Sequence, residues 1–140
     1  MAAFSKFNAF VEGLALGKFN LSTNTLKVLL TNTAPLATNS VKADLTEISS
    51  GNGYTSGGNT ASVTSASQAG GVFKLVLGDP ATFSASGGSI GPFRWAVLYS
   101  DTATNKDLIG YWDYGSSITL ASGESFAVDF DPTTGVLTLA

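Results

Sequence analysis

The chain has 140 residues, enough for one domain whose core needs no cross-links. It contains no cysteine, which excludes disulfides and thiol chemistry, and no histidine, the commonest general base and transition-metal ligand. A net charge of −3 argues against direct nucleic-acid binding, and no apolar run approaches the ~20 residues of a membrane helix. We expect a single domain over 1–140. Only 12% of the residues are charged, as in many proteins whose surfaces contact other proteins. Because the N-terminus lacks the basic-then-apolar order of a secretion signal, we expect the mature chain to start near Met1.

The first predicted element is a short amphipathic helix over about 3–16. Gly17 follows it as a C-cap, and its apolar residues recur at helical spacing: Phe4, Phe7, Phe10, Val11 and Leu14. This stripe has two interpretations. It packs on the sheet as core, which is the commoner case, or it docks on a partner, and Phe4 and Phe7 would then make the contacts.

Alternating apolar residues predict strands at Thr25–Thr31 and Gly71–Leu77, and a shorter one at Thr82–Ala85. The segment Ala43–Ile48 is compatible with a helical turn capped near Asp44 or with a short strand. Gly and Pro punctuate the connections, as is usual in chains built of many short strands.

Residues 49–71 form an uncharged stretch that is rich in Gly, Ser and Thr. One interpretation is a mobile surface loop with a weak edge strand near Thr60–Thr64. The other is a flexible arm that becomes ordered on a neighbouring subunit, since nothing in it carries a charge to keep it solvated. In that case Tyr54, Gly57 and Val63 are the candidate contact residues.

A hairpin is predicted over Pro92–Gly115, which holds both Trp residues and three of the four Tyr residues. Two apolar runs, Phe93–Tyr99 and Leu108–Tyr114, flank a polar break of turn-prone residues. Both faces of this hairpin carry apolar bulk, so each face needs a cover. We expect the chain's own strands, rather than another subunit, to cover Leu98, Ile109 and Tyr111.

A register can be proposed for this hairpin from its side chains. It places Arg94 opposite Asp113 as a structural pair, Trp95 opposite Trp112, and Tyr99 opposite Leu108. A shift by one residue would oppose Trp95 to Asp113 instead. The aromatic side chains expected in the core are Phe93, Trp95 and Trp112.

The C-terminal part predicts further strands at Ser117–Ala121, Ser125–Phe130 and Val136–Leu139. The last two are predicted to pair as a hairpin through the Pro-containing turn 131–135. In total the sequence predicts about eight short strands and one N-terminal helix. The expected fold class is mainly β, a jelly-roll-like or Greek-key antiparallel sandwich.

No residue pattern predicts a catalytic, metal or cofactor site. Asp129 and Asp131 share a face if extended and could bind a hard cation with Asp113 nearby, but a turn-starting Asp131 and a solvated Asp129 explain them more simply. A glycosidase would need a carboxylate pair in a cleft, and nothing singles one out. The Gly-Gly pairs lack the strand-to-helix context of phosphate loops. We therefore expect a protein that is not an enzyme and has no cofactor.

Several segments, in this order, resemble a family of phage structural proteins. The motifs are an FxxFxxxLxxG helix ending at Gly17, LKVLLTNTAP from Leu26, ADLTEI before GNGYTSGG, and FRWAVLYSD followed by KDLIGYWDYG. The order is similar to that of the capsid cementing, or decoration, proteins of tailed bacteriophages. The resemblance spans nearly the whole chain, and its motifs are structural rather than chemical.

The resemblance implies a virion protein on the outer surface of an HK97-type capsid, made and assembled in the host cytoplasm. It implies the major capsid protein as partner, together with a second copy of the chain, as a homodimer or alternatively a trimer. Its role would be to hold neighbouring capsomers against the pressure of packaged DNA, with no direct nucleic-acid or membrane contact. The alternative is a tail- or fibre-associated module that binds a host surface glycan through Tyr and Trp side chains.

Overall fold

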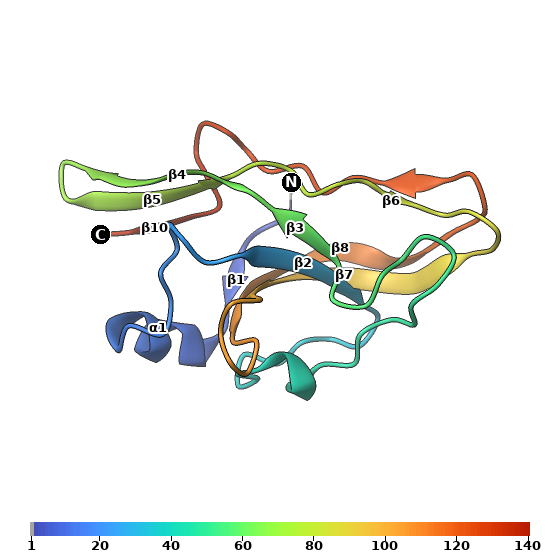
Figure 1. Ribbon diagram of the computed structural model, residues 1–140, viewed down its shortest axis with the longest axis horizontal. Helices are drawn as coiled ribbons and strands as arrows, with labels where there is room; N and C mark the ends of the chain where they lie inside the picture. Colours follow the sequence, from blue (N-terminus) through green and yellow to red (C-terminus); the bar gives the residue numbers. More distant parts are fainter. Residues whose placement is uncertain (1) are drawn as a thin grey trace.

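The computed structural model describes residues 2–140, which form ten strands and one short α-helix (Figure 1). The helix α1 spans Asn8–Ala15, and a 3₁₀ turn spans Lys42–Asp44. The strands are β1 Ser5–Lys6, β2 Leu26–Thr31, β3 Asn59–Ala61, β4 Val63–Ala69, β5 Val72–Leu77, β6 Phe83–Ser84, β7 Ile90–Ser100, β8 Leu108–Leu120, β9 Ser125–Phe126 and β10 Leu137–Leu139.

The strands form three antiparallel sheets. The largest has the order β1-β8-β7-β2-β3, a second has the order β10-β5-β4, and β6 pairs with β9. Figure 1 shows the two smaller sheets on one side of the large sheet, with α1 and the long loops on the other side. The predicted fold class is confirmed: the chain is mainly β, its sheets are antiparallel in a sandwich-like arrangement, and it has one short N-terminal helix.

In the central part of the large sheet, both faces are buried by the chain itself. On the face towards the smaller sheets, Leu98 and Ile109 belong to the main hydrophobic core. On the other face Val97 and Tyr99 form a smaller cluster with Phe7, Leu29 and Leu108, against which Leu45 and Tyr111 pack. This explains why the hairpin of β7 and β8 lacks the apolar–polar alternation of a half-exposed sheet.

The proposed hairpin register is wrong by one residue over most of its length. Trp95 faces Asp113, Ala96 faces Trp112 and Val97 faces Tyr111, whereas the predicted Tyr99–Leu108 pair is present. An irregularity between Leu98 and Tyr99 separates the two registers. One extra residue at such a bulge shifts all later pairs, which puts Tyr111 on the face of Val97 rather than with Leu98 and Ile109.

The N-terminal helix is shorter than the predicted 3–16, because its first residues pair with the sheet. Ser5 and Lys6 lie opposite Tyr111 and Gly110 of β8. At Gly110 a Cβ atom would lie 2.1 Å from the ring of Phe4, so the absence of a side chain makes room for that ring. Gly17 ends the helix as predicted, with φ of +79°.

The predicted C-terminal hairpin does not form. The strand β9 pairs with β6, and β10 pairs with β5. Between them the chain crosses from one small sheet to the other, held by hydrogen bonds from Phe130 N to Asp79 Oδ1 (2.7 Å) and from Val136 N to Leu75 O (2.8 Å). A turn does form near 131–135, but it joins strands of different sheets.

Residues 49–71 are part of the fold rather than a free arm. The strand β3 pairs with β2 in the large sheet, and β4 pairs with β5. In Ala43–Ile48, both predicted alternatives occur in part: a helical turn ends at Asp44, and Glu47 then forms a single bridge with Thr31 of β2. The Asp44 carboxylate accepts N–H bonds from Ser40 and Val41. These hydrogen bonds lower the pKa of Asp44.

Candidate functional site

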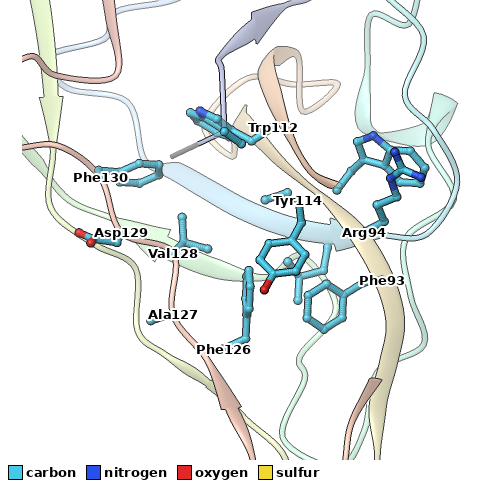
Figure 2. A pocket seen from close by; sticks show the side chains of 13 residues that line it. Phe93, Arg94, Trp112, Tyr114, Phe126, Ala127, Val128, Asp129 and Phe130 are labelled. Carbon is cyan, nitrogen blue, oxygen red and sulfur yellow. The ribbon is translucent and has the colours of Figure 1, made fainter. Parts of the chain in front are cut away.

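An aromatic cleft of about 320 Å³ opens between the β7–β8 hairpin and the segment Phe126–Phe130 (Figure 2). The hairpin supplies one wall, and the C-terminal crossing supplies the other, so residues far apart in sequence meet here. Six aromatic side chains and Val128 make it mainly apolar: Phe93, Trp95, Trp112, Tyr114, Phe126 and Phe130. In Figure 2, Tyr114 lies next to Phe126, which also contacts Phe93, and Phe130 lies beside Trp112.

The aromatic walls are held by ring-to-ring contacts. The Trp112 ring lies 5.4 Å from both Phe4 and Phe130 between centroids. The Phe126 ring contacts Phe93 at 5.1 Å and Tyr114 at 5.7 Å, both edge to face. Such arrangements are favourable for aromatic pairs and fix the rings. Because Tyr114 keeps 58% of its surface exposed, the cleft can present an aromatic side chain to a partner.

An ion pair between Arg94 and Asp113 lies at the rim of the cleft. The Arg94 guanidinium donates to both oxygens of Asp113, at 2.7 and 3.0 Å, and lies 4.9 Å from the Trp95 ring centroid. These bonds raise the pKa of Arg94 and lower the pKa of Asp113. The predicted structural pair is thus present, although the two residues lie diagonally. The predicted core position of Trp95 is wrong, because this ring is only partly buried beneath Arg94.

The carboxylates near the cleft do not form a reactive pair. Asp129 is exposed and, within the part of the chain that the structure describes, is the one acidic residue in the cleft lining. The Asp131 carboxylate accepts N–H bonds from Thr133 (2.7 Å) and Thr134 (3.0 Å), which start the turn and lower its pKa. No cluster of three potential metal ligands occurs within residues 2–140.

A second polar centre, which the sequence did not predict, surrounds Glu47. One carboxylate oxygen accepts bonds from the Tyr54 hydroxyl and from Gly57 N, both at 2.6 Å, and the other pairs with Lys42 Nζ at 2.8 Å. Partial burial favours the neutral acid, but these three donors outweigh it and lower the pKa of Glu47. The Tyr54 hydroxyl also accepts a bond from Leu30 N, so this network ties the loop to the large sheet.

This network corrects most of the predicted partner contacts. Phe7 is fully buried, Tyr54 is 2% exposed, and Gly57 is buried. The Tyr99 hydroxyl donates to Gly57 O at 2.6 Å, so that backbone is occupied on both sides. Phe4 and Val63 are partly buried against the main core. These residues hold the chain together, and none of them offers a large free surface.

Other apolar side chains are exposed instead. They are spread over α1, two loops, two strand ends and the middle of β8: Val11, Leu16, Leu36, Val72, Leu139 and Tyr114. Val11 belongs to the predicted helical stripe, but the sequence pattern did not predict that the others would be exposed. Tyr114 is the one that also lines the aromatic cleft. We therefore take the cleft, with Tyr114 at its edge, as the candidate interaction site.

Within residues 2–140 no helix has the length and apolarity needed to cross a bilayer. Comparisons with protein-family models, with curated proteins and with solved structures found no significant match.

Proposed function

We propose that this chain is a structural capsid protein that binds the outer surface of a phage shell and holds neighbouring capsomers together. The observation that carries the proposal is the aromatic cleft, an apolar site of about 320 Å³ that remains open at the surface of a well-packed domain. Open apolar sites on an otherwise buried core are typical of surfaces that receive side chains of another protein.

The charges around the cleft also suit a protein partner. Arg94 and Asp113 neutralise each other, and Asp129 points away from the rings in Figure 2. A bound apolar side chain would therefore meet aromatic walls without burying an unpaired charge. On a shell, weak contacts of this kind are repeated many times, so the lattice is stable even where each contact is modest.

The resemblance to cementing proteins supports the same assignment, including the major capsid protein as partner and the virion surface as location. The alternative, glycan binding by Trp and Tyr side chains, is weakened by the position of Trp112. That ring is 9% exposed and packed between Phe4 and Phe130, so little of it is free for a sugar to stack on.

The test is the heat stability of phage particles with and without this chain. Particles assembled without it should release their DNA at a lower temperature, and adding the purified chain back should restore the original value. Imaging of the restored particles should show the chain between capsomers on the outer surface. Equal heat stability with and without the chain, or a location in the tail, would contradict the proposal.

The add-back experiment needs a variant that folds. Deleting residues 49–71 is unsuitable because it removes β3, β4 and the buried Tyr54. Tyr114→Ala is better, since it truncates an exposed cleft residue. It should bind shells more weakly than the native chain, whereas Leu139→Ala, which shortens an exposed side chain outside the cleft lining, should bind normally. A glycan array probed with the same proteins separates the alternative role.

A further inference from the structure

The strand β4, Val63–Ala69, is a free sheet edge. Among residues 2–140, it has a neighbour on one side alone in the order β10-β5-β4. The other outer strands of the two larger sheets are short: β1 has two residues, and β3 and β10 have three each, whereas β4 has seven. A strand edge exposes unpaired N–H and C=O groups, which another strand can use for pairing.

This edge also lacks the usual protection against pairing. Natural edge strands are commonly guarded by Lys, Pro or an inward-pointing charge. Residues 49–71 contain none of these, and the side chains of β4 are small or neutral. The one irregularity lies between Val63 and Ser65, where the pairing with β5 shifts. From Ser65 to Ala69 the pairing is regular, so five residues present an even edge.

We propose that this chain self-associates through antiparallel pairing of β4 with β4 of a second copy. An antiparallel pair of identical strands obeys twofold symmetry, so one edge serves both partners. Centring the pair on Ser67, the middle of the regular part, joins the two sheets as β10-β5-β4-β4-β5-β10. This self-contact is proposed for the capsid protein of the previous section. Pairing of two β4 strands, however, requires only the purified chain and does not depend on the shell.

Charge does not oppose this pairing. The nearest cation on the same sheet is Lys74 of β5, which lies opposite Ser67 within the chain and donates to Thr133 O at 2.8 Å. In the paired sheet the two copies of Lys74 would be three strand spacings apart, roughly 14 Å. That exceeds the screening length of about 8 Å at physiological salt, so their repulsion is weak.

The shape of the molecule also leaves room for a second copy. Figure 1 shows the β4–β5 hairpin projecting from one end, with β4 on its outer side. Its turn, Gly70–Gly71, is exposed, and the next residue, Val72, is 41% exposed. A twofold partner would therefore extend the small sheet outward, beyond β4.

The first test is the oligomeric state of the purified chain, measured by sedimentation over a range of concentrations. The native chain should be dimeric at high concentration and dissociate on dilution. Ser67→Lys places two like charges directly opposite each other, so its dissociation constant should rise at least about fivefold. Ser50→Lys, an exposed position in the same uncharged stretch, is the matched control and should dimerise like the native chain.

The second test uses the absence of cysteine in this chain. Opposite residues of antiparallel strands have Cα atoms about 4.5–5.5 Å apart, within the range of a disulfide. Ser67→Cys should therefore cross-link rapidly into a covalent dimer under mild oxidation, and Ser50→Cys should not. Circular dichroism and thermal unfolding confirm that each variant folds.

Three results would overturn the inference: a native chain that stays monomeric at every concentration, equal dimerisation of the two Lys variants, or equal cross-linking of the two Cys variants. If the chain is monomeric and Ser67→Lys loses binding to shells alone, the edge pairs with a strand of the capsid protein instead. That outcome removes the self-contact but leaves the proposed function intact. A dimer that never binds shells would keep the self-contact and remove the proposed function.

Discussion

The large five-stranded sheet and the small β10-β5-β4 sheet illustrate two uses of the same kind of strand. In the large sheet the central strands are covered on both faces, and residues such as Leu29 and Val97 are fully buried. In the small sheet β4 is half-exposed along its length, and Val72 and Leu139 are exposed. The small sheet thus adds Leu75 and Leu77 of β5 to the main core but leaves its outer strand β4 open to contacts.

The difference shows that segments with few charged residues occur in two structural settings in this protein. In the β7–β8 hairpin it accompanies burial by the chain's own loops and helix. In β4 it accompanies an exposed edge and neutral, small side chains. Composition alone does not separate these cases, because an apolar or neutral stretch is uncharged in both. Substitutions that are matched between the two sheets can separate them.

The largest contrast is expected for two glycines of the same stretch. At Gly58, with φ of +76°, a Cβ atom would lie 1.8 Å from Val28 O of the large sheet. Gly58→Ala should therefore cost about 3–5 kcal/mol of unfolding free energy. At Gly70, with φ of +60°, nothing lies within 4 Å, so Gly70→Ala should cost about 1–2 kcal/mol from backbone strain alone. Urea unfolding measures both, and equal losses would mean that 49–71 does not dock on β2.

A second contrast compares one leucine from each sheet. Leu98 in β7 is fully buried, and Leu98→Ala should cost about 2–5 kcal/mol because it leaves a cavity. Leu139 in β10 is 54% exposed, and Leu139→Ala should cost less than about 1 kcal/mol. Thermal and urea unfolding of the two variants give the comparison. Similar losses would show that the small sheet is as well packed as the large one.

Local sequence pattern correctly predicted several elements of the fold. Strands at Leu26–Thr31 and Val72–Leu77, the hairpin near Pro92–Gly115 and the Arg94–Asp113 pair were all found where expected. These depend on alternation and on neighbours a few residues apart. The single-residue error in the hairpin register came from a bulge after Leu98, which the local sequence does not predict.

The failures involve partners that are distant in sequence. The last two strands were paired with each other because a turn signal joined them, but tertiary packing assigns β9 to β6 and β10 to β5. The stretch 49–71 contains no charged residue, so the sequence permits a free arm. The charge that holds it to the fold belongs to a Glu outside the stretch. That residue, Glu47, accepts bonds from Tyr54 and Gly57. The aromatic cleft was missed for the same reason, since its two walls come from separate segments.

A third prediction concerns the pH dependence of this Glu47 network. Folding lowers the pKa of Glu47 from its ordinary 4.5, so the ionised carboxylate stabilises the native state. This contribution is complete above about pH 4.5 and is lost as the pH falls through the folded-state pKa. Glu47→Gln should cost about 1–3 kcal/mol at pH 7, because it weakens bonds to a charged acceptor.

The difference in unfolding free energy between the native chain and Glu47→Gln should shrink as the pH falls below about 4.5. Urea unfolding at several pH values measures this difference. Glu12→Gln, at an exposed position on α1, is the control and should match the native chain throughout. A gap that stays constant down to about pH 3 would mean that the shape of Glu47, rather than its charge, ties the loop to the sheet.

The smallest effect on folding is expected at the edge of the aromatic cleft. Tyr114 is 58% exposed, and its ring contacts Phe126 edge to face, so Tyr114→Ala should cost about 1 kcal/mol or less. Its effect on shell binding should be larger, a loss of about tenfold or more in affinity, about 1.4 kcal/mol, because exposed aromatics beside an apolar cleft are typical anchors. Binding of labelled protein to particles lacking the chain measures this.

Val72→Ala, at the tip of the β4–β5 hairpin, is the control from the small sheet. If Val72→Ala weakens binding and Tyr114→Ala does not, the small sheet rather than the cleft faces the shell, and the two regions exchange their assigned roles.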